Sequence, residues 1–353
     1  MDGPTRTPAA RPLISLSRRR LIELLAVAGG GAVIVGCRSR GRAGTPKDAP
    51  MARALGFDTD LALTPNADFY VMKRGLVPEV VLDDWVLTIG GDVDQPVRLT
   101  FDDLARLPEH AVMRTLECIG NKPGGKLIGN AVWSGAAMAD VLQLAGPRAA
   151  ELRLNAADGY DTGVSLALAS DPRSFLVWRM NGEVLPLAHG YPVRCLFPGV
   201  YGQKQPKWLT GITVQAEHHL GYYESRGWSD AATVLVNSRV DGPRHRATVP
   251  RGAPLEVRGI AFADESGVAR VEVRVDDRLA EAATLVKAPS PHADLCWTEW
   301  SWTWHAPEPG NHVIAAWAVD GRGRGQSRPK KNLLGGEIKD GSTEIHSISV
   351  LVS

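Results

Sequence analysis

The sequence predicts two structural parts, an α+β domain followed by a β-sandwich. Over about residues 54–238, strand-like and short helix-like segments are mixed without the regular strand–helix repeat of a parallel sheet. After about residue 240, apolar and polar residues alternate with period two, which is typical of strands with one buried face. With 353 residues, the chain is long enough for two domains of ordinary size.

The first domain, predicted over residues 54–238, combines short strands with two short helices. Thr100 can cap a helix over residues 104–107, and Ser134 can cap a second helix that ends at Ala145, before Gly146-Pro147. Asn181-Gly182 is typical of a hairpin turn. Apolar and β-branched runs predict strands at residues 84–90, 151–155, 164–168, 174–180 and 192–197.

The second domain, predicted over residues 239–353, has the pattern of a β-sandwich, with short strands between turns that contain Gly, Pro or Asp. Trp300, Trp302 and Trp304 fall on one face of one strand, and we expect them to pack in the core or in an interface. The predicted strands cover residues 254–262, 271–275, 300–304, 312–319 and 345–352.

The N-terminus has the pattern of an export signal. Adjacent arginines at residues 18–20 precede an apolar stretch that ends in Ile34-Val-Gly-Cys37 and is shorter than the roughly 20 residues of a membrane span. Residues 1–36 are therefore predicted to be a twin-arginine signal peptide, with Cys37 lipidated and residues 37–53 as a flexible tether. The protein is then expected in the cell envelope, lipid-anchored on the outer side of the cytoplasmic membrane. An uncleaved anchor and an ordinary core helix are the alternatives.

Composition and charge restrict the class of function. The net charge of +1 does not predict a nucleic-acid-binding protein. None of the four cysteines lies in a CxxC or CxxCH motif, and no Gly-rich nucleotide motif occurs. Cys195 lies in an apolar run and is expected to be buried, and the sequence does not decide whether it pairs with Cys296. His218-His219 is not expected to bind a metal, because neighbouring side chains on a strand point apart.

Two segments can carry chemistry. Cys118 lies in a turn-rich stretch, where a single thiolate could act. The segment of residues 189–208 is shaped by Gly and Pro and contains Arg194, Lys204 and Lys207. Taken separately, an inert cysteine and an ordinary basic loop remain open. Together, a soft anionic ligand and a cationic loop suit a soft metal carried by a phosphorylated organic cofactor.

These segments resemble the molybdopterin domain of the sulfite oxidase family. The matching strings are at residues 69–70, 115–121, 131–135, 158–160, 180–182, 189–208 and 226–228. The resemblance implies a sulfite-oxidase-like fold and a molybdenum–molybdopterin cofactor, with Cys118 on the metal. It also implies that the C-terminal sandwich is an immunoglobulin-like dimerisation domain, and hence a homodimer.

The resemblance assigns further roles. Tyr160 is placed like the active-site tyrosine of the family, as a catalytic residue. Contacts to the cofactor fall on Asn121, His189, Arg194, Lys204 and Lys207. Because the chain shows no haem motif, the electron partner is expected to be an external cytochrome or a quinone-linked carrier.

Two departures from the family concern the substrate. Met72 and Pro123 stand where the family places arginines that bind sulfite, while Lys73-Arg74 and Lys122 lie close by in sequence. Because a lost guanidinium removes charge-assisted hydrogen bonds, the metal chemistry is better supported than the substrate. The hypotheses are a sulfite dehydrogenase-like enzyme, a molybdoenzyme acting on another sulfur or nitrogen oxide such as a sulfoxide, and a non-catalytic surface lipoprotein. Retention of Cys118 and of the whole basic loop argues against the last.

Overall fold

The computed structural model describes residues 49–305, 308–327 and 339–353 of the chain, which belong to one unit, Pro46–Ser353. The predicted signal peptide and Cys37 lie outside the described residues. Within the described part, no helix is long and apolar enough to span a membrane. The domain borders predicted at residues 36, 53 and 238 stay predictions.

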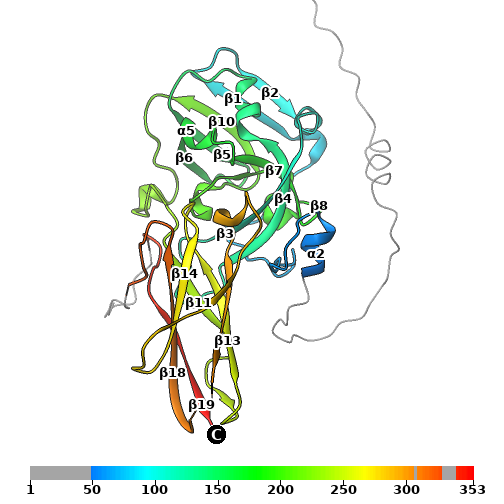
Figure 1. The fold of residues 1–353 in the computed structure, drawn as a ribbon. Helices are drawn as coiled ribbons and strands as arrows, with labels where there is room; N and C mark the ends of the chain where they lie inside the picture. Colours follow the sequence, from blue (N-terminus) through cyan, green and yellow to red (C-terminus); the bar gives the residue numbers. More distant parts are fainter. Residues whose placement is uncertain (1–48, 306–307, 328–338) are drawn as a thin grey trace, which may run out of the picture. The chain divides into compact units, whose positions relative to one another are not determined.

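One mixed sheet and one antiparallel sheet form the first part of the described chain (Figure 1). One has the order β2 (Val97–Thr100), β1 (Val86–Gly91), β10 (Leu209–Gln215), β5 (Glu151–Ala156) and β6 (Asp161–Ser165). The other has the order β3 (His110–Glu117), β4 (Ile128–Ala137), β7 (Phe175–Met180) and β8 (Glu183–Val184), with β9 (Arg194–Leu196) on β7. β1 and β10 run parallel, and the other pairs of these two sheets are antiparallel.

The helices of the described chain are all short. The α-helices are α2 (Ala49–Ala54), α3 (Phe101–Leu104), α4 (Met138–Gln143) and α5 (Leu166–Ala169). The 3-10 turns are η1 (Leu82–Asp84), η2 (Leu187–His189), η3 (Gly202–Lys204), η4 (Glu224–Arg226) and η5 (Ala293–Leu295). Because strands outnumber helices and no βαβ repeat occurs among the described residues, the mixed strand and short-helix fold is confirmed.

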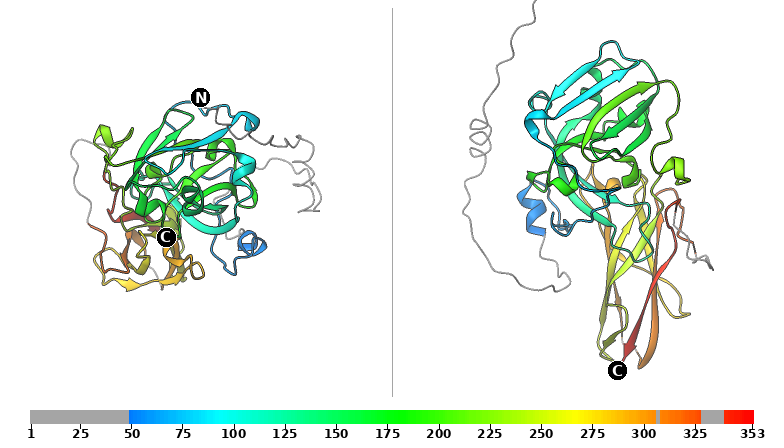
Figure 2. Two further views of the ribbon diagram at one scale, coloured as in Figure 1. Left: turned by 90° about the horizontal axis from the view of Figure 1, so that it is seen from above. Right: turned by 180° about the vertical axis from the view of Figure 1, so that it is seen from behind.

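Two further sheets enclose one apolar core in the C-terminal part (Figure 2). The first has the order β11 (Asn237–Gly242), β13 (Leu255–Phe262), β17 (Thr298–Trp304) and β16 (Thr284–Val286). The second has the order β12 (Ala247–Val249), β19 (His346–Val352), β18 (Gly310–Asp320), β14 (Val268–Val275) and β15 (Glu281–Ala282). Trp300 and Trp304 are buried in this core, as expected, and Trp302 packs against it. The immunoglobulin type of this sandwich stays a prediction.

Local signals predicted some elements correctly and misassigned others. Thr100 does cap a helix, because its hydroxyl accepts a hydrogen bond from the amide of Asp103, but that helix covers Phe101–Leu104 and does not extend to residue 107. The turn at Asn181-Gly182 joins β7 to β8, as predicted, and both residues have positive φ. The prediction that Ser134 caps a helix is wrong, since Ser134 lies inside β4 and α4 begins only at Met138.

Candidate functional site

A cavity of about 430 Å³ opens where three segments come together: the loop after β3, the turn after β5 and the basic loop of residues 189–208. Five of the seven residues assigned to catalysis or to the cofactor line it: Cys118, Tyr160, His189, Arg194 and Lys207. The structure therefore brings together side chains that are up to about ninety positions apart in the sequence. Their roles stay proposals, and what the structure supplies is their common placement.

Cys118 is held by the turn that follows β3. Its amide donates to the carbonyl of Leu127 at 2.9 Å, and its carbonyl accepts the amide of Asn121 at 2.9 Å. Burial raises the pKa of the thiol, while a hydrogen bond from the Gly120 amide opposes that change. In the protein alone the sulfur thus carries a proton, and a metal that bound here would displace it, because thiols bind metals as thiolates.

Arg194 is a buried cation at the wall of the cavity. Its guanidinium donates to the carbonyls of His189 and Gln205 at 3.1 and 3.4 Å and lies over the ring of Trp133. Burial lowers its pKa to about 10. Among the described residues, no carboxylate forms an ion pair with it, although a buried charge is costly without a partner.

Lys207 is a second cation of the cavity wall, and like Arg194 it contacts a backbone carbonyl and an aromatic ring. Its ammonium donates to the carbonyl of Ala188 at 2.9 Å and lies 4.2 Å from the ring centroid of Trp208. Burial and the charge of Arg194 lower its pKa to about 7. No ion pair with a carboxylate joins Lys207 to the rest of the described chain either. Two cations that face one cavity and form no ion pair with a carboxylate of the described chain can hold an anion such as a phosphate.

His189 and Tyr160 are kept neutral by burial. Nε2 of His189 lies 2.9 Å from the carbonyl of Asn66, so this nitrogen donates and Nδ1 is left as an acceptor. Burial lowers the pKa of His189, with Arg194 and Lys207 acting in the same direction. Burial also raises the pKa of Tyr160 well above its ordinary value, and its hydroxyl donates to the carbonyl of Gln203.

Lys204 and Asn121 do not line this cavity, so their expected contacts to the cofactor stay predictions. The ammonium of Lys204 is buried against Glu224 at 2.7 Å and Asp230 at 2.9 Å, and it also donates to the carbonyl of Gly163. Lys204 thus takes part in a buried ion pair. Asn121 instead bonds to Glu117 and to the amide of Leu127, so it fixes the loop that carries Cys118.

The structure also shows where the two remaining described cysteines and His218 lie. Cys195 and Cys296 are both buried with free thiols, so they form no bridge. His218 pairs with Glu151 and Asp230, and no cluster of metal-binding side chains occurs among residues 49–305, 308–327 and 339–353. His218 is an exposed side chain, and its hydrogen bond to Glu151 raises its pKa.

The mouth of the cavity contains residues that the sequence did not single out as a group. Arg74 donates to the carbonyls of Asp158 and Gly159 and lies over Tyr222, whose ring is also covered by Arg226. Tyr70, Met72, Lys73, Tyr223 and Trp228 also line the cavity. A signal existed for these residues, because they lie next to the strings at residues 69–70 and 226–228. Pro123, in contrast, does not line this cavity.

The comparisons with known proteins agree with this site. Residues 74–223 match the family model described as the oxidoreductase molybdopterin binding domain. Over these residues the chain is similar to a molybdopterin-binding oxidoreductase domain. Mitochondrial sulfite oxidase of Rattus norvegicus is 28% identical over 296 residues, which cover 70% of this chain and 54% of the relative. Mitochondrial sulfite oxidase of Drosophila melanogaster is 32% identical over 267 residues, which cover 63% and 46%.

Further likenesses extend the range of chemistry among the relatives. An NADH nitrate reductase of Volvox carteri is 28% identical over 298 residues, which cover 68% of this chain and 34% of the relative. The crystal structure of the sulfane dehydrogenase SoxCD from Paracoccus pantotrophus superposes with a TM-score of 0.68 at 20% identity, and 81% and 83% of the two chains are covered. This last likeness supports the fold. The chain spans about half the length of the curated relatives it matches.

The predicted cofactor, molybdenum on molybdopterin, is confirmed by these matches. The cavity of the molybdopterin-binding domain also fits the cofactor chemically. Cys118 offers a soft sulfur ligand for the metal, and Arg194 with Lys207 offers the charge that a phosphate requires.

Proposed function

We propose that the protein is a molybdenum-dependent oxidoreductase of the sulfite oxidase type, with Cys118 as the protein ligand to the metal. The observation that carries this proposal is one cavity lined by a single thiol and by two cations that lack carboxylate partners in the described chain. When bound, the cofactor supplies two-electron redox chemistry and oxygen-atom transfer. The protein supplies orientation and electrostatics.

The residues of the cavity have separate tasks in this proposal. Cys118 fixes the metal, while Arg194 and Lys207 hold the phosphate of the cofactor. His189 presents Nδ1 as a neutral acceptor, because Nε2 is engaged by the carbonyl of Asn66. Tyr160 keeps its proton at neutral pH and, because its hydroxyl donates to the carbonyl of Gln203, acts as a hydrogen-bond acceptor for the substrate in the cavity.

Sulfite is the first candidate substrate, and the enzyme would then be a sulfite dehydrogenase. Lys73 and Arg74 line the mouth of the cavity and supply positive charge for a small oxyanion. A sulfoxide or another sulfur or nitrogen oxide is the second candidate. Met72 favours it, because a thioether lines the cavity where the family has a guanidinium.

The partners and the location complete the proposal. We infer an external cytochrome or a quinone-linked carrier as electron partner, an exported protein anchored through a lipid on Cys37, and a homodimer formed through the sandwich. Support comes from the haem-free sequence, from the basic and apolar N-terminal pattern, and from the family resemblance.

Replacement of Cys118 tests the central assignment. In a matured Cys118→Ser variant, the pterin is expected to remain through Arg194 and Lys207, while turnover falls by several orders of magnitude because the thiolate is lost. Molybdenum is measured by inductively coupled plasma mass spectrometry, and turnover is measured anaerobically on oxyanions and sulfoxides with artificial dyes. Cys296→Ser is the matched control, because Cys296 is buried elsewhere and donates only to the carbonyl of Met113. Full activity of Cys118→Ser, or wild-type protein without molybdenum, would contradict the proposal.

A further inference from the structure

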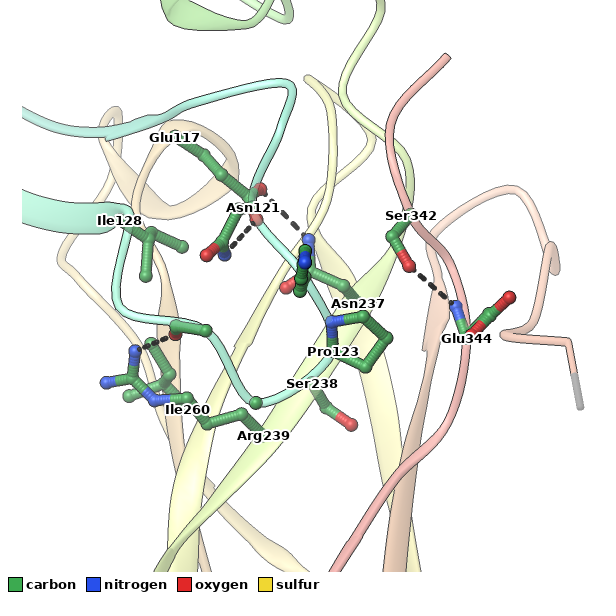
Figure 3. A pocket seen from close by; sticks show the side chains of 13 residues that line it. Glu117, Asn121, Pro123, Ile128, Asn237, Ser238, Arg239, Ile260, Ser342 and Glu344 are labelled. Carbon is green, nitrogen blue, oxygen red and sulfur yellow. Dashed lines mark hydrogen bonds between the residues drawn. The ribbon is translucent and has the colours of Figure 1, made fainter. Parts of the chain in front are cut away.

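The loop that carries Cys118, residues 118–127, lies against two strands of the C-terminal sandwich, β11 and β19. Figure 3 shows this junction, where Glu117 and Asn121 face Asn237. The space enclosed there is about 10 Å³, room for roughly one water molecule, so no organic ligand fits. The junction is therefore a packed contact and not a second binding site.

A buried carboxylate joins the loop to β11. Glu117 is 3% exposed, and its two oxygens bond in opposite directions. Oε1 accepts from the amide group of Asn121 at 2.8 Å, and Oε2 accepts from the amide group of Asn237 at 3.0 Å. Asn237 is itself oriented by the carbonyl of Leu235. The residue next to Cys118 is thus tied at once to its own loop and to the sandwich.

A second bond fixes the far end of the loop. The guanidinium of Arg239, on β11, donates to the carbonyl of Gly125 at 2.8 Å (Figure 3). The same guanidinium is held by Asp241, with Nε 2.6 Å from Oδ1. Because Asp241 holds the guanidinium of Arg239 in place, the hydrogen bond from Arg239 to Gly125 restrains the backbone of the loop.

Close packing against β19 adds a third constraint. Gly124 has φ of +73°, and a Cβ at this position would collide with the imidazole of His346. That imidazole cannot easily move, since its Nδ1 accepts from the amide of Val240 at 3.0 Å. The middle of the loop is therefore pressed against a ring that the sandwich holds in place.

We propose that the sandwich is a positioning element for Cys118, acting through Asn237, Arg239 and His346. The inference rests on the proposed role of Cys118 as metal ligand. A reactive group must be held within a fraction of an ångström, and a loop alone does so poorly unless a rigid scaffold supports it. Here the supporting scaffold comes from the C-terminal sheets, in addition to β3 and β4 on either side of the loop.

The reactivity of the Cys118 thiol tests this inference without any metal. The full chain is produced in a host that cannot make the pterin, and the rate of alkylation by iodoacetamide is followed for each cysteine by mass spectrometry. Asn237→Ala is expected to raise the rate at Cys118 several-fold, because the loop loses its tie to β11. The buried thiols of Cys195 and Cys296 serve as internal reporters and are expected to stay unreactive while the fold persists.

Glu265→Gln is the matched control. Glu265 forms another contact between the sandwich and the first part of the chain, 2.7 Å from Arg173, but remote from the loop. This variant is expected to leave Cys118 at the wild-type rate. If Asn237→Ala does not fold, Arg239→Met replaces it, because this change removes the bond to Gly125 without leaving a buried carboxylate alone.

The outcomes separate the two proposals. An unchanged rate at Cys118, or an equal rise in Glu265→Gln, would overturn the positioning role. A failure of the proposed function would be seen in a different measurement, as full turnover by the matured Cys118→Ser variant. Molybdenum content of matured Asn237→Ala gives a second readout, and it is expected to fall below that of Glu265→Gln.

Discussion

Arg194 and Lys207 show how single residues give this cavity its chemistry. Each is a cation that folding places beside backbone carbonyls and an aromatic ring, without a carboxylate partner among the described residues. Such an arrangement is costly in the empty protein and becomes favourable when an anion arrives. The two residues differ in one respect, because only Lys207 has a pKa near neutrality.

The charge of Lys207 predicts a pH-dependent anion affinity. Its ammonium is protonated below its pKa of about 7 and neutral above it, so anion binding should weaken as the pH rises through this value. Sulfate, a dianion on both sides of neutrality, is expected to bind the cofactor-free protein roughly tenfold more weakly on the alkaline side, the loss of one charge-assisted hydrogen bond. Isothermal titration calorimetry measures this change.

Neighbouring groups do not obscure the effect. The pKa of His189 is lowered and that of the Cys118 thiol is raised, so neither gains or loses a charge as the pH passes from neutral to mildly alkaline values. Lys207→Arg is the control, because a guanidinium stays charged throughout and should bind sulfate equally on both sides of neutrality. An affinity of the wild type that does not change with pH would contradict the assignment.

Single residues also mark the limit of sequence prediction for the site. The basic loop was recognisable from Arg194 and Lys207, yet Lys204 belongs to a different environment. Its carboxylate partner Glu224 lies on η4, twenty positions later, and nothing in the local pattern links the two. Sequence identifies a cluster of cations, but only the fold decides which of them find carboxylates.

At the scale of elements, the strands on either side of Cys118, β3 and β4, are among those that the sequence did not predict. Nearly every residue of β4 is buried, so it lacks the alternation that reveals a strand with one exposed face. The hydroxyl of Ser134 imitates a helix cap, but pairing of β4 with both β3 and β7 overrides this local preference. Similarly, the predicted strand over residues 164–168 is split, because Ser165 ends β6 and caps α5.

Gly135 provides a test of how tightly β4 is paired. It lies where the register between β4 and β7 shifts, and a Cβ there would collide with the carbonyl oxygen of Leu176. Gly135→Ala is therefore expected to lower the free energy of unfolding by about 1–3 kcal/mol, as for overpacked cores. Gly90→Ala is the control in β1, because its Cβ would meet no atom within 4 Å. Urea denaturation measures both variants, and equal stability of the two would contradict the packing argument.

At the scale of the whole molecule, the sandwich could be predicted and its contact with the Cys118 loop could not. Buried and half-buried residues alternate over residues 271–275 of β14 and 298–301 of β17, so this period is visible in the sequence. The contact between Glu117 and Asn237 joins residues 120 positions apart, and neither residue has a local pattern that announces it. The catalytic proposal thus depends on an arrangement that only the folded chain displays.

The proposed cell-envelope location can also be tested at the scale of the whole molecule. It depends on residues outside the described part of the chain. A twin-arginine signal carries folded proteins, which suits an enzyme that must receive its cofactor before export. Replacing Arg18 and Arg19 by lysine is expected to leave a cofactor-loaded precursor in the cytoplasm, detected by cell fractionation and intact mass. Cys37→Ser is expected to permit export but to abolish lipidation. In a detergent phase-separation assay, the variant should therefore partition into the aqueous phase, whereas the wild type partitions into the detergent phase. A wild-type protein that is neither exported nor lipid-modified would contradict the proposed location. The assignment of Cys118 would remain intact, because the proposed metal site is built entirely from residues beyond the signal.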